Sequence, residues 1–555
     1  MTLKAEKQRR KFLRPLKKAT EPDQLSLRQE VIRLHQEVFR RNQRRINDSV
    51  YGYSTEFLAY QETYQQAVSD YHSQATTDEL DIAVTNTNLI YFGDYHTLPQ
   101  AQRSYLRMLR RLPPDRPVTL ALEFLPGKFQ NLIHKFMTDD LTESEFLEAI
   151  GYEPMNMFGT WEVYSEIFQL AKERGYRALG IDTLRKGAGD GSLKRRDTYA
   201  ARRIAKELRT HPDHLIVVFI GEMHVAPTHL PKIVLEELDQ MPEKGPGLII
   251  YQNAEPIYWQ LQEQGLEHQT ALVRISNHEY CIINTPPIVC QQSFLNWLEM
   301  DDITQSIDAV EENFKHYVEV LLKVFNLEIG DALSTIEIAT VVDLSFLKRL
   351  QRRGDFSKDD MEQIKKQILS SESYYIPRAN MVYLGNLSMN HASEEATHFL
   401  RHVTSGCQEP LNLVDAFYAR ALEEAVGFLG SKMLNHKRKC PHTPFFAKQS
   451  RSRSVTSENK TLARGVIKHD KMMRGEKVRG MQQIYESGPE LFNKITHVIG
   501  YQLGDKLFYA LMDGTIQMSH VRELFFEHFE EEGTALTTYL HWALQVRDIQ
   551  IPERL

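Results

Sequence analysis

The stretch "LIYFGDYH", residues 89–96, is an apolar run that stops at a glycine and is followed by Asp94, Tyr95 and His96. The same pattern returns as "VVFIGEMH", residues 217–224, which ends in Glu222, Met223 and His224. Short, continuous apolar runs of this kind are typical of strands that are buried on both faces. Glycine lets the chain bend sharply where it leaves a strand. We therefore expect two buried strands, each followed by a turn of the form Gly-acid-x-His.

Three further runs have the same texture, namely "VTLALEF" (118–124), "RALGID" (177–182) and "GLIIYQN" (247–253). Between the runs lie amphipathic segments such as "VYSEIFQLAKERG" (163–175), in which apolar residues recur at helical spacing before a glycine stop. Apolar strands that alternate with helices indicate a mostly parallel sheet covered on both faces. The sequence thus predicts an α/β fold, with N-terminal helices before it and a mainly α-helical domain after it.

The length of 555 residues favours two or three domains. We expect a basic leader with N-terminal helices at 1–75, the α/β domain at 76–298 and a mainly helical domain at 299–555. Within the last domain, residues 436–480 contain thirteen Lys and Arg but only three acidic residues. We interpret this segment as an exposed basic loop or linker, with contact to nucleic acid as the alternative.

The composition is that of ordinary globular protein, with 42% hydrophobic and 25% charged residues and a net charge of −7. No apolar run is long enough for a transmembrane helix. The four cysteines lack CxxC spacing, and neither a signal peptide nor a lipidation motif is seen, so we expect a cytoplasmic protein. Eight Lys and Arg among the first twenty residues suggest weak contact with an anionic surface. Assembly as a homodimer stays open.

Polar residues gather where the predicted strands end. Ligands bind beyond the carboxyl ends of parallel strands, so His96, Glu123 and His224 should share one polar cleft, and Asp182 ends a further strand. Two imidazoles with carboxylates suit a divalent transition metal. The residues predicted to bind such a metal are Asp94, His96, Glu123, Glu222 and His224. The alternative is that each histidine only stabilises its own turn through a neighbouring carboxylate.

Other polar and aromatic residues are weaker candidates. Trp161 and Tyr164, at the entry to a helix, are candidates for an aromatic wall, although Tyr164 also lies on the apolar stripe of that helix. Asp197 precedes a helical segment and fits an N-terminal cap. The chain has no P-loop, no GxGxxG and no HExxH, which argues against the usual nucleotide and zinc-peptidase sites.

At these residues the chain resembles the ChaN-like haem-binding proteins, which belong to a larger group with Tiki-type metalloproteases and erythromycin esterases. The resemblance spans about 85–255 and rests on five ordered blocks: "GDYH" with "LPQAQ", "LEFLPGKFQ", "TWEVYSEIFQLAKERGYRALGID", "RRDTYAARRI" and "IGEMHVAPTHLP". It implies an α/β fold that binds haem or iron in the ChaN branch and hydrolyses substrates with a metal in the others. Asp94 stands where relatives more often have Glu.

For a haem-binding protein, the resemblance makes haem the expected cofactor, and the residues considered for binding it are Tyr95, Trp161 and Tyr164. A tyrosinate can bind ferric haem axially. For the hydrolytic relatives, the site maps to Asp94, His96, Glu123 and His224, with His96 or a metal-bound water as nucleophile and Glu123 handling protons. We therefore expect a haem- or iron-binding protein that takes haem or another small ligand. The alternatives are a metal-dependent hydrolase of an ester or amide, and an interaction scaffold with a vestigial site.

Overall fold

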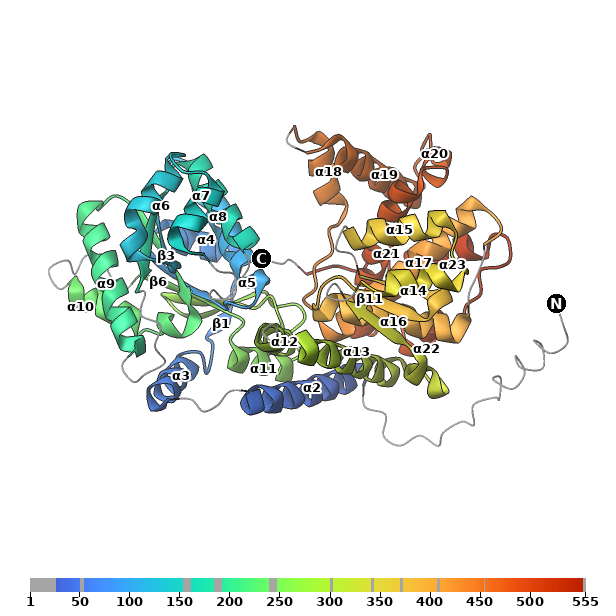
Figure 1. Ribbon diagram of the computed structural model, residues 1–555, viewed down its shortest axis with the longest axis horizontal. Helices are drawn as coiled ribbons and strands as arrows, with labels where there is room; N and C mark the ends of the chain where they lie inside the picture. Colours follow the sequence, from blue (N-terminus) through green and yellow to red (C-terminus); the bar gives the residue numbers. More distant parts are fainter. Residues whose placement is uncertain are drawn as a thin grey trace.

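The structure is a computed structural model that describes residues 26–49, 54–152, 161–183, 192–238, 247–299, 303–340, 344–369, 373–406, 410–453 and 455–552. The basic N-terminal run, for which we expected contact with an anionic surface, lies outside these residues. Figure 1 shows two bodies side by side, one built around a sheet and the other mainly of helices. Within the described residues, no helix is both long and apolar enough to cross a membrane.

The first body contains an eight-stranded sheet with the order β1-β7-β8-β6-β2-β5-β3-β4. The six strands from β8 to β4 run parallel, and β7 and β1 extend the sheet antiparallel at one edge. The strands are β1 (Ser73–Gln74), β2 (Leu89–Asp94), β3 (Val118–Pro126), β4 (Arg177–Asp182), β5 (Leu215–Gly221), β6 (Leu248–Gln252), β7 (Leu272–Ser276) and β8 (Glu279–Ile282). Every strand predicted from an apolar run is present, so the mostly parallel sheet is confirmed.

Helices cover both faces of this sheet. One face packs on α4 (Thr77–Thr85), α5 (Pro99–Arg111), α6 (Gln130–Met137), α7 (Glu143–Ile150) and α8 (Trp161–Arg174). The other face packs on α3 (Thr55–Ala67), α9 (Ser192–Thr210), α10 (Leu230–Glu237) and α11 (Glu255–Glu263). Neighbouring strand residues alternate between the two cores: Ile90 and Phe92 face one core, whereas Leu89 and Tyr91 face the other. The covered sheet explains why the central strands read as uninterrupted apolar runs.

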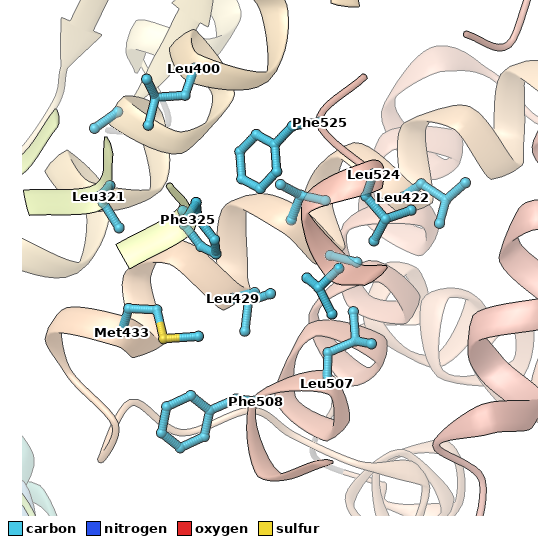
Figure 2. Close-up of a cluster of buried hydrophobic side chains, with 14 of the residues drawn as sticks. Leu321, Phe325, Leu400, Leu422, Leu429, Met433, Leu507, Phe508, Leu524 and Phe525 are labelled. Carbon is cyan, nitrogen blue, oxygen red and sulfur yellow. The ribbon is translucent and has the colours of Figure 1, made fainter. Parts of the chain in front are cut away.

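The second body is mainly helical, as expected. Its core is formed largely by α13 (Ile303–Phe325), α16 (Met389–Ser405), α17 (Leu413–Leu434), α21 (Pro489–Met512), α22 (Met518–Glu523) and α23 (Thr534–Gln545). Helix α17 is apolar around most of its circumference, because neighbouring helices surround it. Figure 2 shows Leu422 and Leu429 of α17 among side chains of the surrounding elements, including Leu321, Leu400 and Leu507.

Two features of this body differ from the sequence-based expectation. It also contains a three-stranded sheet of β9 (Glu337–Thr340), β10 (Tyr374–Ile376) and β11 (Met381–Leu384), whose strands are too short to give a clear alternation. The prediction of an exposed basic loop at 436–480 is wrong, because this segment contains α18 (Thr443–Arg451) and α19 (Ser457–Met473). At its start Lys437 and Arg438 are buried, since their cationic groups find carbonyl and carboxylate partners.

The two helices of the predicted N-terminal region pack on different bodies. Helix α2 (Leu27–Ser49) places Val31, Leu34 and Val38 in the helical core, together with Ile288 of α12 (Pro287–Glu299). Helix α3 instead packs its Tyr64 against the α/β core. The apolar stripe of α2 therefore packs on a neighbour. The precise division into domains at 75 and 298 stays a prediction.

Candidate functional site

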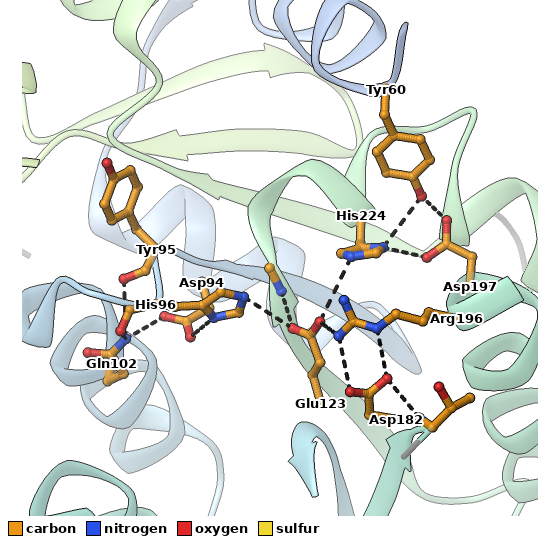
Figure 3. Close-up of polar contacts among 12 residues, drawn as sticks. Tyr60, Asp94, Tyr95, His96, Gln102, Glu123, Asp182, Arg196, Asp197 and His224 are labelled. Carbon is orange, nitrogen blue, oxygen red and sulfur yellow. Dashed lines mark hydrogen bonds and ion pairs between the residues drawn. The ribbon is translucent and has the colours of Figure 1, made fainter. Parts of the chain in front are cut away.

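Four adjacent strands bring the polar residues of the sequence patterns to one edge of the sheet. In the order β2-β5-β3-β4, His96 follows β2, His224 lies in the short 3₁₀ turn after β5, Glu123 is on β3 and Asp182 ends β4. Because parallel strands end at the same edge, residues distant in the chain converge there. Figure 3 shows His96, Glu123 and His224 grouped together, so the shared polar site predicted for these three is present.

Glu123 is the centre of this strand-end cluster. Its side chain is only 8% exposed, and its Oε2 accepts a hydrogen bond of 2.6 Å from the backbone N–H of Gly221. Its other oxygen forms an ion pair with Arg196 of α9. The Nε2 atoms of His96 and His224 lie 3.7 and 3.8 Å from its two oxygens. Burial raises the pKa of Glu123, but Arg196, the histidines and the Gly221 N–H outweigh it and lower the pKa to about 2. Glu123 is therefore a carboxylate at neutral pH.

His96 is the accessible imidazole of the cluster. Its side chain is 28% exposed, and its Nδ1 lies 2.9 Å from Oδ2 of Asp94. Asp94 itself is buried and accepts a hydrogen bond of 2.7 Å from the Gln102 side chain on α5. Burial lowers the pKa of His96, but the carboxylates of Glu123 and Asp94 raise it more, to about 9. Asp94 thus fixes the ring with Nε2 turned toward Glu123.

His224 is the buried counterpart, with a side chain only 6% exposed. Its Nδ1 lies 2.6 Å from Oδ1 of Asp197 on α9, and the Tyr60 hydroxyl of α3 donates to the other oxygen of Asp197. Burial lowers the pKa of His224, whereas Asp197 and Glu123 raise it, with a net rise. The ring of His229 stacks on Tyr60 with centroids 3.6 Å apart. Each histidine therefore has its own aspartate on Nδ1 and shares Glu123 on Nε2.

Arg196 connects the third and fourth strands of the site. Its Nε lies 2.9 Å from Oδ1 of Asp182, and its Nη2 contacts both Asp182 and Glu123. Burial lowers its pKa, but Glu123 and Asp182 raise it more, so the guanidinium is permanently charged. Alternate residues of β3 face α9, which places Glu123 opposite the second turn of that helix. The strand-end cluster consequently holds a fixed positive charge between two carboxylates.

The predicted metal ligands are only partly brought together. Asp94, His96, Glu123 and His224 form one connected cluster, as Figure 3 shows. Glu222 instead hydrogen bonds to Tyr64, and burial raises its pKa to about 8. Among the described residues, compact groups of three donors suited to a metal occur only in the helical body. The two Gly-acid-x-His turns therefore differ: the acid of the first supports its own histidine, and the acid of the second does not.

The aromatic residues considered for haem lie in two different settings. Tyr95 is half-buried beside Leu98 and Ala101, and Figure 3 shows its ring pointing away from Glu123. Trp161 is buried in the core with several phenylalanines. Tyr164 stacks on Phe124 in the same core, at a centroid distance of 4.0 Å. Burial, followed by the charges of Asp94 and Glu123, raises the pKa of Tyr164 well above its usual value. Packing thus accounts for Trp161 and most of Tyr164, whose hydroxyl stays neutral.

Three residues of the site were not predicted to belong to it. Asp197 is not a helix cap, as its sequence position suggested, because α9 begins at Ser192 and Asp197 lies within it, 1% exposed. A buried aspartate inside an arginine-rich helix requires a partner, and the block "RRDTYAARRI" of the family resemblance was the available signal for Arg196 and Asp197. Tyr60 carried no signal, since it lies on a polar helix 137 residues before its partner Asp197.

Part of the chain is similar to a known protein family. Residues 82–189 match the family described as "Haem-binding uptake, Tiki superfamily, ChaN". No curated protein matches. Among solved structures, that of the type III effector HopBA1 is similar over 33% of this chain and 86% of the effector, with 20% identity and a TM-score of 0.26.

The fold and the site define an α/β domain with a polar cluster at its strand ends. Residues 82–189 are similar to the ChaN-like haem-binding family, as the sequence resemblance implied. The family match covers β2, β3 and β4 but ends before α9, so Arg196, Asp197 and His224 lie beyond it.

Proposed function

We propose that the ChaN-like domain binds haem, or iron, at its strand ends, with His96 as the side chain that holds the iron. The observation that carries this proposal is the partly exposed imidazole of His96, whose Nδ1 is fixed by Asp94 at 2.9 Å while Nε2 faces the site. Metal-binding histidines commonly have a carboxylate on the second ring nitrogen, which fixes the ring and makes the donor nitrogen more basic. The family description favours the same ligand class.

The contacts of Glu123 favour haem over a bare metal ion. An ion held only by protein would need several ligands from the cluster, yet both oxygens of Glu123 already accept hydrogen bonds, from Arg196 and from the Gly221 N–H. Haem supplies four nitrogen donors itself and requires one or two axial side chains from the protein. The residues present therefore fit a haem iron bound by His96, with Asp94 orienting the ring.

A hydrolase is the second candidate, because two Asp–His pairs face one carboxylate and one arginine. In such an enzyme His96 would transfer protons to the substrate, and Arg196 would stabilise negative charge as it develops. With a pKa of about 9, His96 carries a second proton at neutral pH, which binding of iron would displace. In a hydrolase it suits the role of acid better than that of base. Glu123, with a pKa of about 2, is too weak a base to activate water unaided.

The test is the visible spectrum and metal content of the purified full-length protein, followed by titration with haemin. We expect a Soret band and saturable haemin binding. His96→Ala should weaken this binding by roughly 10–100-fold, since losing an iron ligand costs at least as much affinity as losing the hydrogen bond that orients a ligand. The matched control is His278→Ala, at an exposed histidine in the β7–β8 turn. Tyr95→Phe and Tyr164→Phe test the tyrosine ligands suggested by the sequence.

Other outcomes favour the competing functions. Unchanged haemin binding by His96→Ala would contradict the proposed ligand. Turnover of a chromogenic ester that disappears in His96→Ala or Glu123→Gln, without haem binding, would favour the hydrolase. Absence of both activities would favour the scaffold. The homodimer and the cytoplasmic location stay predictions, and light scattering of the purified protein tests the former.

A further inference from the structure

A second cluster of charged side chains lies inside the helical body, between α16, α17 and α21. Helices α16 and α17 approach closely, because Gly427 faces the ring of His398 and Gly430 faces Thr397. A Cβ at either glycine would collide with the facing side chain. Figure 1 shows these helices in the helical body, away from the eight-stranded sheet. The glycines of α17 thus make space for a buried imidazole. Such a polar ring costs free energy to bury and is not needed to pack two helices together.

Three metal-donating residues meet at this position. Glu394 and His398 come from successive turns of α16, and Glu424 comes from the facing α17. One donor atom from each lies within 4.8 Å of the other two. The three residues are 3%, 8% and 2% exposed, so their charged groups are withdrawn from water. Helical bundles commonly build metal sites from inward-facing carboxylates and histidines of this kind.

Two atoms of the cluster are left without a partner. Glu394 Oε1 and His398 Nε2 are buried and have no hydrogen-bond partner among the described residues. The opposite ends of both side chains are fixed: Oε2 of Glu394 lies 2.7 Å from Arg438, and Nδ1 of His398 lies 3.3 Å from Glu395. A buried polar atom without a partner loses its hydration and gains no hydrogen bond in exchange. A cation that binds both atoms would make up this loss.

We propose that Glu394, His398 and Glu424 form a binding site for a divalent first-row transition-metal ion, in addition to the strand-end site. Two carboxylates with one imidazole and no thiolate are typical ligands of zinc, manganese and ferrous iron. The carboxylate of Glu395 holds the His398 ring, as carboxylates commonly do for metal-bound histidines. This proposal does not depend on what the strand-end cluster binds.

The surroundings of the three residues provide a route for the ion. All three line a groove that is bordered by α15 (Lys358–Leu369), α16, α17, α19 and α21. His497 of α21 also lines the groove, is 46% exposed and contacts Glu424 at 2.9 Å. Arg420 contacts the other oxygen of Glu424 at 2.6 Å. These neighbours orient Glu424 at the inner wall of the groove.

The test uses the full-length protein in a His96→Ala background, so that loss of strand-end metal is not mistaken for loss of the second site. After treatment with EDTA, Zn²⁺ is titrated by competition with a chromophoric chelator, and retained zinc is measured after dialysis. We expect one zinc per chain. Glu394→Gln and His398→Gln should each raise the Kd roughly 10–100-fold.

The matched control is Glu423→Gln, next to Glu424 in the sequence. The side chain of Glu423 is 35% exposed and contacts Arg420 rather than the donor group. Circular dichroism and the thermal midpoint establish that each variant is folded. X-ray absorption at the zinc edge of the His96→Ala protein provides a measurement that needs no further variant. We expect oxygen donors with a single imidazole.

Two outcomes would overturn the proposal. One is that the protein retains no zinc after dialysis, which would make the cluster a metal-free network of glutamates, arginines and histidines. The other is that Glu394→Gln binds zinc as tightly as Glu423→Gln. Failure here would leave haemin binding by His96 unaffected, so the two proposals can be distinguished.

Discussion

The two clusters use the same residue types in different ways. At the strand ends, Glu123 lies between two histidines and Arg196, and both of its oxygens accept hydrogen bonds. Within the helical body, Glu394 is also paired with an arginine and lies near a histidine, but one of its oxygens has no partner. His96 is 28% exposed, whereas the side chain of His398 is 9% exposed.

This comparison shows that residue types alone do not identify a metal site. The sequence motifs placed metal ligands at the strand ends, yet the compact donor group with unpartnered atoms among the described residues is on α16 and α17. The distinguishing feature is whether the protein satisfies every donor of the group: Arg420 and His497 hold Glu424, but Glu394 and His398 each keep one buried atom without a partner. At the strand ends Arg196 provides the positive charge that a metal would otherwise supply.

The largest expected effect comes from replacing the arginine of each cluster by methionine. Arg438→Met leaves Glu394 buried and uncompensated, so we expect the free energy of unfolding to fall by about 3–5 kcal/mol. Arg196→Met should cost less, about 1–3 kcal/mol, because this side chain is 31% exposed and water partly replaces it. Urea denaturation of the full chain measures both. Equal losses would mean that the two glutamates are equally well solvated.

The second expected effect concerns the glycine that faces the histidine in each cluster. Gly427→Ala should destabilise the protein by about 1–3 kcal/mol, because the buried ring of His398 has no space to move. Gly221→Ala should cost about 1 kcal/mol, since the added Cβ would lie 2.9 Å from Nε2 of the exposed His96. Thermal unfolding of the two variants against wild type checks the order. A larger loss for Gly221→Ala would contradict the assignment of His398 as the more confined ring.

A smaller effect is expected from pH. The folded-state pKa of His96 is raised to about 9 from 6.5, mainly because Glu123 and Asp94 outweigh burial. Its charged form therefore stabilises the fold fully below pH 6.5, and this contribution of about 1–2 kcal/mol is lost as pH rises from 6.5 to 9. Denaturation of metal-free protein across this range measures the loss. His96→Gln should abolish it, and the same slope in that variant would assign the titration to another group.

The smallest expected effect is at the rim of the helical groove. Lys494 is 39% exposed and forms ion pairs with Glu458 and Glu490. Exposed pairs of this kind contribute little, so Lys494→Met should change the free energy of unfolding by about 0.5 kcal/mol or less. Urea denaturation in parallel with Arg438→Met checks the contrast. A loss as large as that of Arg438→Met would mean that burial does not explain the difference in strength between the Arg438–Glu394 ion pair and the ion pairs of Lys494.

The sequence by itself determined the central strands and the edge of the sheet at which His96, Glu123 and His224 meet. Continuous apolar runs predicted the central strands because a covered parallel sheet buries both faces of each strand, and this needs no knowledge of contacts. Because parallel strands share one carboxyl edge, His96, Glu123 and His224 were predicted together correctly. Local patterns were less reliable where polar residues are buried, as at Lys437 and Arg438.

The partners of those residues were decided only by the tertiary structure. Glu222 repeats the position of Asp94 in its turn, yet it faces Tyr64, and Asp197 of α9 supports His224 in its place. Glu394 and Glu424 gave no signal, since they lie on separate helices with ordinary charged sequences. Which charges meet depends on how helices pack, and packing is set by contacts between residues far apart in the chain, which no local pattern records.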